Sequence, residues 1–277
     1  MPADSRAEIV IKPATGLRLR DLAEVWRYRA LLGSMARRQI TGRMSDMWLG
    51  AFWILARPIA MTLSFVFIRN ISAAQMGGIV PYPLFAFSGL VLWFYMAGTI
   101  AEVAGALSRN AGLVQKVYFP RLVSPTVPVI ANLVELALGA VLIAAMMAYY
   151  GVWPSWRLAL LPVVLLQMMA LVLGIGLIFS SLNLLSRDWD QFLALFLYLG
   201  LFISPVLYAA DRLPEKVRFL YHLNPFAGTL TAVRSCLFGE IPFPVQEWVY
   251  AASVSLVLIL LAVALFRRTE SQMLDKL

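Results

Sequence analysis

The sequence predicts an all-α integral membrane protein with six transmembrane helices, an N-terminal amphipathic interface helix, and a re-entrant helical segment between spans five and six. Hydrophobic residues make up 61% of the 277 residues and charged residues only 14%, whereas a soluble domain is about half apolar and about a quarter charged. Apolar runs of about 20 residues, long enough to cross a bilayer, recur along the chain. We therefore divide the chain into a cytoplasmic N-terminal segment over 1–46 and a transmembrane domain over 47–277.

The N-terminal segment contains one candidate helix, over 21–38, which is rich in arginine. Its broad apolar face consists of Leu22, Val25, Trp26 and Leu32. Arg29 interrupts this face and has to extend its guanidinium towards water. Such a helix is suited to the inner membrane interface, where basic residues meet anionic lipid. A simple topology anchor and a docking surface for a cytoplasmic partner are both open readings of this helix.

Six apolar runs give the transmembrane spans. We predict them over 47–68, 83–107, 122–150, 158–185, 192–210 and 248–266. The last three runs carry no charged residue. The first three carry one each, Arg57, Glu102 and Glu135, and a charge at the centre of a span costs about 3 kcal/mol on insertion scales.

The segment over 219–239 is mostly apolar, but it contains His222, Asn224, Pro225 and Arg234. Proline removes a backbone donor and disfavours helix just before itself, so we expect a break at the Asn-Pro pair. Irregular backbone at membrane depth is tolerated only inside protein or facing water. We therefore predict a re-entrant or broken helical hairpin that dips into the outer face. The alternative, a seventh span, would put the C-terminus outside.

The basic residues predict the orientation. With six spans, sixteen of the 23 Lys and Arg residues fall on the side of the termini and six on the other side. The positive-inside rule therefore places both termini in the cytoplasm. The net charge of +8 is mostly a topology signal, and we expect no nucleic-acid partner.

Motifs for catalysis and nucleotide binding are missing from the sequence. No G-x-x-x-x-G-K-[ST] phosphate loop occurs, and no G-x-S-x-G, H-E-x-x-H or C-x-x-C. One cysteine and one histidine leave little material for a metal site, so we expect neither a catalytic residue nor a bound cofactor or metal in this chain. Asp188 and Asp190 could form an acid site, but a solvated helix start explains them better. The energy for any transport has to come from elsewhere.

The loop over 109–121 mixes charged residues with apolar ones that a solvated loop would not keep exposed. A short amphipathic helix that stops at Pro120 would present those apolar side chains to a groove on a partner protein. The alternative is that they return to the membrane surface.

Several segments together carry a family resemblance. In chain order they are MWLGAFWILARPI, NAGLVQKVYFPRLVSP, LNLLSRDWDQF, FISPVLYAADRLPEKVRFLYHLNPFAG and FRRTESQMLDKL. With the arginine-rich helix before them, they resemble the permease subunit of type-2 ABC exporters for polysaccharides, the family that exports O-antigen, capsule and teichoic acids. The resemblance covers nearly the whole chain.

The resemblance implies a homodimer in the cytoplasmic (inner) membrane, paired with two copies of a separate ATPase that binds ATP and Mg²⁺. The substrate would be a polysaccharide on undecaprenyl diphosphate, threaded through a channel between the two permeases. The stretch over 213–239 would match the family's re-entrant helices. The interface helix would include Trp26, Arg27 and Arg29. The coupling helix that seats in the ATPase would include Arg109, Asn110, Gly112, Leu113, Val114, Lys116, Tyr118, Phe119 and Arg121.

Arg57 departs from the family pattern, in which an uncharged polar residue is expected before Pro58. It lies about 15 Å up its span, and Glu135 lies about 20 Å up the third span. We therefore hypothesise a structural Arg57–Glu135 ion pair, with a pore-lining Arg57 as the alternative. Phe52, Trp53 and Tyr198 are candidates for lining the channel, although an interfacial aromatic belt explains most aromatic residues of the chain.

Three other functions fit the sequence less well. An ABC permease for drugs or small lipids would share the six spans. A membrane-embedded enzyme acting on lipid-linked glycans would need the Asp188/Asp190 pair for activity. A secondary transporter would work without an ATPase, but it normally needs charged residues in its spans, and the predicted spans contain only three.

Overall fold

The computed structural model of the chain describes residues 27–45, 50–72, 80–109, 122–209 and 215–276. The regular structure of these ranges is helical, and they contain no strand. The predicted all-α class is therefore confirmed.

Five helical stretches are long and apolar enough to span a membrane: Phe52–Ile71, Tyr82–Ala104, Val123–Tyr150, Trp156–Leu182 and Val245–Phe266. They belong to α3 (Gly50–Ser72), α4 (Tyr82–Ala104), α7 (Val123–Ala131) with α8 (Leu133–Tyr150), η1 (Trp156–Leu160) with α9 (Leu161–Leu182), and α13 (Val245–Lys276). Each lies over one of the predicted spans, so the chain is a multi-pass membrane protein.

The remaining predicted span, 192–210, corresponds to a shorter helix. α10 (Asp188–Ile203) has 16 residues, which at about 1.5 Å per residue is shorter than the roughly 30 Å of hydrocarbon in a bilayer. The helix ends at Ser204, which has extended backbone (φ −84°, ψ 152°) and precedes Pro205. The count of six spans therefore stays a prediction.

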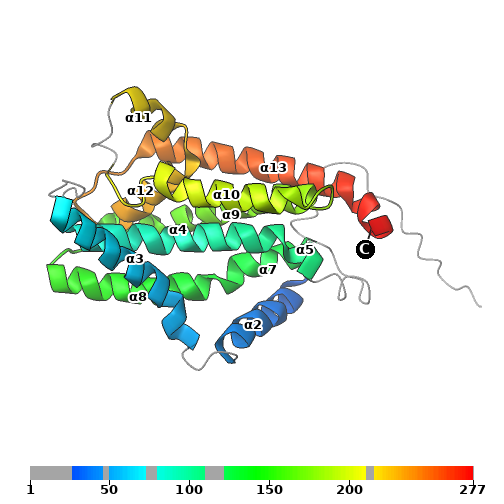
Figure 1. Cartoon of the computed structure of the whole chain (residues 1–277), viewed down its shortest axis with the longest axis horizontal. Coiled ribbons are helices and arrows are strands. Elements are labelled where there is room, and N and C mark those ends of the chain that lie inside the picture. The colour runs from blue at the N-terminus through cyan, green and yellow to red at the C-terminus, as the bar shows by residue number, and fades with distance from the viewer. Residues whose placement is uncertain (1–26, 46–49, 73–79, 110–121, 210–214, 277) are drawn as a thin grey trace, which may run out of the picture.

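α4 lies at the centre of the bundle. In its most apolar window 78% of the residues are buried, against 11% in α3. It contacts α3, α8, α9 and α10, and α9 in turn packs along α13; Figure 1 shows α4, α8, α9, α10 and α13 along the long axis of the molecule, with α3 crossing them obliquely. Gly176 of α9 lets this helix approach α4, because an added Cβ would meet the side chain of Val103.

The third apolar stretch is not one continuous helix. α7 and α8 are separated at Asn132, four residues after Pro128. Proline lacks the backbone N–H of a regular helix and commonly kinks it. The interruption places the Asn132 side chain at the junction of the two helices, where it is 2% exposed.

Two shorter pairs of elements occupy the ends of the bundle. We call the end with α2 (Arg29–Ser45), α5 (Ala106–Arg109) and the last turns of α13 the α2 end, and the end with α11 (Glu215–His222), α12 (Pro225–Leu237) and the first turns of α13 the α12 end (Figure 1). The apolar side of α2 packs on α7 through Leu32 and Ala36. The start of the predicted 21–38 helix lies outside the described residues, and the described helix continues beyond 38 to Ser45.

The break predicted at Asn224–Pro225 is present between α11 and α12. The Asn224 side chain caps α12 by accepting a hydrogen bond from Phe226 N over 3.0 Å. Its Nδ2 donates to Ser204 Oγ over 2.9 Å, which fastens the break to the end of α10. The depth of these two helices in a membrane stays a prediction.

Candidate functional site

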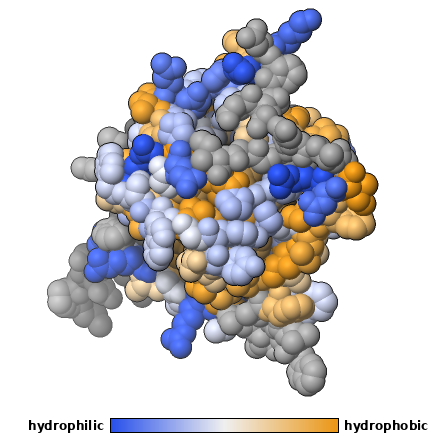
Figure 2. All heavy atoms as spheres, turned by 90° about the vertical axis from the view of Figure 1, so that its left-hand side faces the viewer, coloured by the Kyte–Doolittle hydropathy of each residue, from blue (hydrophilic) through white to orange (hydrophobic). Residues whose placement is uncertain are grey.

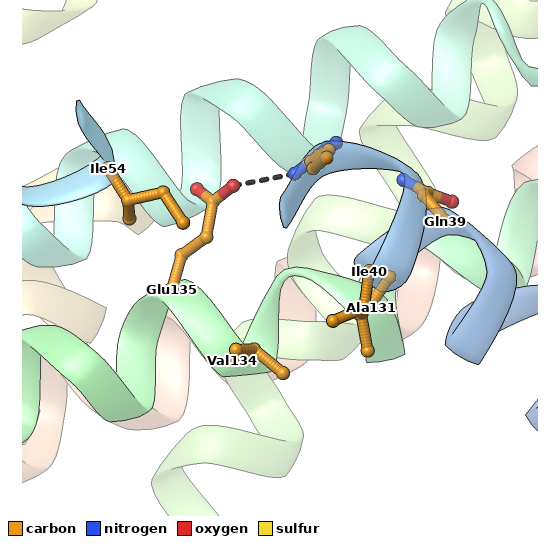
Figure 3. A pocket seen from close by; sticks show the side chains of 7 residues that line it. Gln39, Ile40, Ile54, Ala131, Val134 and Glu135 are labelled. Atoms are coloured by element: carbon orange, nitrogen blue, oxygen red, sulfur yellow. Dashed lines mark hydrogen bonds and ion pairs between the residues drawn. The ribbon is translucent and has the colours of Figure 1, made fainter. Parts of the chain in front are cut away.

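Arg43, near the end of α2, lies between two glutamates of two different spans. Its Nη1 donates to Glu135 Oε1 over 2.6 Å, and its Nη2 donates to Glu102 Oε1. Figure 3 shows Glu135 reaching from α8 towards α2, with the ion pair to Arg43 drawn as a dashed line. Between a quarter and a third of each side chain is exposed, so these ion pairs are partly shielded from water.

Uncharged side chains complete this arrangement, which we call the Arg43 cluster. Its members are Gln39, Arg43, Thr99, Glu102, Asn132 and Glu135. Gln39 Nε2 donates to Glu102 Oε2 over 2.8 Å. Asn132 accepts from Arg43 over 2.9 Å and donates to Thr99 Oγ1 over 3.1 Å. The cluster therefore ties α2 to α4 and to the junction of α7 and α8.

The hollow beside the cluster is too small for a ligand. It is lined by Gln39, Ile40, Arg43, Ile54, Ala131, Val134 and Glu135 (Figure 3). Its volume of about 10 Å³ is room for about one water molecule. The cluster is therefore a mechanical connection between helices and not a binding pocket.

Arg109 connects the predicted coupling loop to the same place. Its Nη2 donates to the carbonyl oxygen of Glu102. The Glu102 side chain is held by α2 and its carbonyl oxygen by the first residue of the 109–121 loop. The other residues predicted to couple to an ATPase, from Asn110 to Arg121, lie outside the described residues.

The partner of Glu135 differs from the one hypothesised from the sequence. Glu135 pairs with Arg43, whereas the guanidinium of Arg57 lies over the ring of Phe94, 5.6 Å from its centroid. Glu135 was expected to pair with a residue at a similar depth in another span. Its partner Arg43 instead belongs to α2, which precedes the first span. A pore-lining role for Arg57 stays a prediction.

The candidate channel residues lie on exposed surfaces of two helices that both contact α4. Phe52 and Trp53 on α3 are 56% and 57% exposed, and Tyr198 on α10 is 64% exposed. Phe52 and Trp53 pack edge to face, 5.7 Å between ring centroids. In the interface helix, Arg27 and Arg29 are exposed, and Trp26 lies outside the described residues.

Asp188 and Asp190 form the first turn of α10. Asp188 Oδ2 accepts from Ser186 Oγ over 2.8 Å, and Asp190 accepts from the amide of Asn183. Both are exposed, and acidic residues in a first turn are favoured by the helix dipole. In the part of the chain that the structure describes, no group of three His, Cys, Asp or Glu residues could hold a metal ion.

Arg234 of α12 is a second arginine that joins several helices, and its role was not predicted from the sequence. It is 2% exposed. Its guanidinium donates to the carbonyl oxygens of Phe85, Pro205 and Val206 over 2.9, 2.5 and 2.6 Å. It also lies over the Phe85 ring, 3.7 Å from the centroid. We call these acceptors the carbonyl cage; they belong to the start of α4 and the turn after α10.

Burial lowers the pKa of Arg234 to about 9, which leaves the guanidinium charged at neutral pH. A Cβ added at Gly89 would collide with its Nη2 and with the Val206 carbonyl oxygen. The glycine of α4 therefore provides the space that the arginine occupies. An arginine in an otherwise apolar stretch was the visible signal in the sequence, but its acceptors are backbone atoms, which no residue pattern specifies.

One protein family and several known proteins match most of this chain. The sequence profile of the family described as ABC-2 type transporter matches residues 30–238. The O-antigen export system permease protein RfbA of Myxococcus xanthus is 31% identical over 257 residues, which cover 91% of this chain and 98% of that protein. RfbA of Klebsiella pneumoniae is 28% identical over 76% of this chain and 81% of its own length. The polysialic acid transport protein KpsM of Escherichia coli is 25% identical over 86% of this chain and 92% of its own length.

Proposed function

The chain belongs to the ABC-2 type transporter family, and we propose that it is the channel-forming transmembrane subunit of an ATP-driven exporter of undecaprenyl-diphosphate-linked polysaccharide. The proposed cargo is O-antigen, capsule or teichoic acid, and the proposed membrane is the cytoplasmic one. The observation that carries this proposal is the match to an O-antigen permease over 91% of the chain.

Two further observations support a polysaccharide cargo. The polysialic acid transport protein matches over 86% of the chain, so relatives named for two different polysaccharides share most of its length. The sequence contains no phosphate loop for ATP, which agrees with a permease driven by a separate ATPase that binds ATP and Mg²⁺.

The proposed assembly contains two copies of this chain and two ATPase subunits. Large side chains of α3 and α10 are exposed in the single chain, which leaves these two faces available to lipid or to a second copy, and we assign part of them to the channel. Phe52, Trp53, Arg57 and Tyr198 would line this path. Six spans with cytoplasmic termini, and α11 and α12 as re-entrant helices on the outer side, complete the proposal.

The Arg43 cluster supports a role for the α2 end in coupling. The 109–121 loop would seat in the ATPase, and the interface helix would rest on membrane lipids. Glu102 contacts both, through its side chain to Arg43 and through its carbonyl oxygen to Arg109. A displacement of the loop on ATP binding would therefore reach α2 and α4 together.

Deletion of the gene tests the proposal. We expect undecaprenyl-linked polymer to accumulate on the cytoplasmic side while surface polymer disappears, with restoration by the unaltered gene. Unchanged surface polysaccharide, with a shift in drug sensitivity or lipid composition, would instead identify a permease for drugs or small lipids. Glycan-transfer activity in the purified single subunit, lost on Asp188→Asn, would identify an enzyme.

A further inference from the structure

A second cavity lies at the α12 end, away from the Arg43 cluster. Its volume is about 520 Å³, within the range of about 300–1,000 Å³ typical of small-molecule sites. Its lining includes Phe85, Arg218, Tyr221, His222, Phe243 and Glu247. Figure 2 looks onto this end of the molecule, where hydrophilic and hydrophobic residues are mixed.

The walls of the cavity come from parts of the chain that are distant in sequence. They are the start of α4, the turn after α10, α11, α12 and the approach to α13. The carbonyl cage around Arg234 holds the first, second and fourth of these together. The cavity is therefore a feature of the tertiary fold and not a gap beside one loop.

Polar side chains of the cavity are held in place by hydrogen bonds and an ion pair. His222 Nδ1 lies 3.1 Å from Glu247 Oε1, which joins α11 to the first turn of α13. The hydroxyl groups of Tyr221 and Thr231 lie 2.9 Å apart, and the Tyr208 hydroxyl donates to Ile203 O over 2.7 Å. Side chains fixed in this way are preorganised for a ligand.

These side chains also retain hydrogen-bonding capacity. Glu247 uses one carboxylate oxygen for His222, and a carboxylate has a second oxygen to accept from a ligand. Arg218 also lines the cavity, and its guanidinium is a donor group. Phe85, Phe243 and the neighbouring prolines add apolar surface to the lining. The cavity thus combines donors, acceptors and apolar walls.

We propose that this cavity binds a sugar residue of the exported polysaccharide at the outer mouth of the channel. The inference rests on the proposed function and adds a binding site to it. A sugar ring carries hydroxyl groups, each both donor and acceptor, around its edge and presents C–H groups on its faces, which matches both kinds of wall. An acyl chain would leave Arg218, His222 and Glu247 facing a ligand that cannot pair with them.

Direct binding tests the site independently of export. The probe is a short oligosaccharide released by mild acid from the strain's own surface polymer, titrated calorimetrically into the full permease–ATPase complex without nucleotide. We expect saturable binding that Glu247→Gln weakens about tenfold, since the ligand then donates to a neutral amide oxygen instead of a charged carboxylate. Glu240→Gln is the matched control, because Glu240 is exposed and does not line the cavity.

A second variant keeps the test decisive. Ala209→Phe fills the cavity from its rim without changing charge, and we expect it to abolish oligosaccharide binding while the complex still elutes and melts like the unaltered one. Equal binding by both variants and the unaltered complex, no binding by the unaltered complex, or displacement of the sugar by undecaprenyl phosphate would overturn the inference. If any one of these results were found and gene deletion still removed the surface polymer, the proposed function would stand without this site.

Discussion

Two arginines fasten short helices to α4 at opposite ends of the bundle, and different chemistry holds each of them. Arg43 is partly exposed and pairs with two carboxylates. Arg234 is almost fully buried, and its acceptors within the described residues are carbonyl oxygens and a serine hydroxyl. Side-chain ion pairs can exchange partners when helices shift, whereas a cage of backbone atoms requires the chain itself to move. The comparison suggests an adjustable α2 end and a rigid α12 end.

The largest effect is expected from Arg234→Met, which tests the rigid end. It leaves the buried carbonyl oxygens of Pro205 and Val206 without the donors that Arg234 supplies, and each unsatisfied buried group costs about 1–3 kcal/mol. We expect loss of most folded protein, measured as the monodisperse fraction after detergent extraction. Arg187→Met is the control, since Arg187 is an exposed residue at the start of α10. Normal yield of Arg234→Met would remove the carbonyl cage as a source of stability.

Gly89→Ala tests the same cage from the side of α4. The added methyl group collides with Arg234 and the Val206 carbonyl, and overpacking of this kind costs about 1–3 kcal/mol. Gly98→Ala in the same helix meets nothing within 4 Å, so it should leave the melting temperature unchanged or raise it slightly. A similar melting temperature for both variants would contradict the tight fit.

Arg43→Gln tests the adjustable end. It leaves Glu102 and Glu135 without their shared cation, and we expect a loss of about 1–2 kcal/mol, between the values for exposed and buried pairs. If this end transmits movement, export should also fall further than the loss of folded protein explains. Arg38→Gln, on an exposed part of α2, is the control.

The double variant Arg43→Gln/Glu135→Gln sharpens this test. Removing one carboxylate together with the cation should recover part of the stability that Arg43→Gln loses. The loss in the double variant is compared with the sum of the losses in Arg43→Gln and Glu135→Gln alone, and the difference between the two values measures the interaction of the pair. Purely additive losses would mean that the Arg43–Glu135 contact contributes nothing.

The smallest effect on stability is expected from Arg57→Gln. Its contact with Phe94 is a cation–π interaction worth about 0.5–1 kcal/mol at an exposed site, so the melting temperature should change little. Reduced export at normal protein level would support a channel position, whereas normal export would remove Arg57 from the path.

The sequence was most informative where a single segment determines its own structure. Long runs with one charged residue or none identified the stretches around α4, α9 and α13, because a bilayer requires long apolar helices. The helix break at Asn224–Pro225 follows from the chemistry of proline. The length of α10 was overestimated, since the apolar run continues past the turn at Ser204.

Contacts between distant segments were harder to predict from the sequence. Glu135 could be recognised as a charge in need of a partner, but Arg43 was one basic residue among several before the first span. Arg234 could not be paired at all, because its acceptors are carbonyl oxygens exposed by a helix end and a turn. The cavity at the α12 end depends on five separate segments and has no local pattern.

The position of Glu102 has a consequence for anyone who builds chimeric permeases. The N-terminal helix and the 109–121 loop look like separate modules that could be exchanged one at a time between relatives. In this chain both are joined to one residue of α4, through its side chain and its main chain. A transplanted helix without a cation at the position of Arg43 would meet an unmatched acid, so the helix, the loop and the end of α4 form one exchangeable unit.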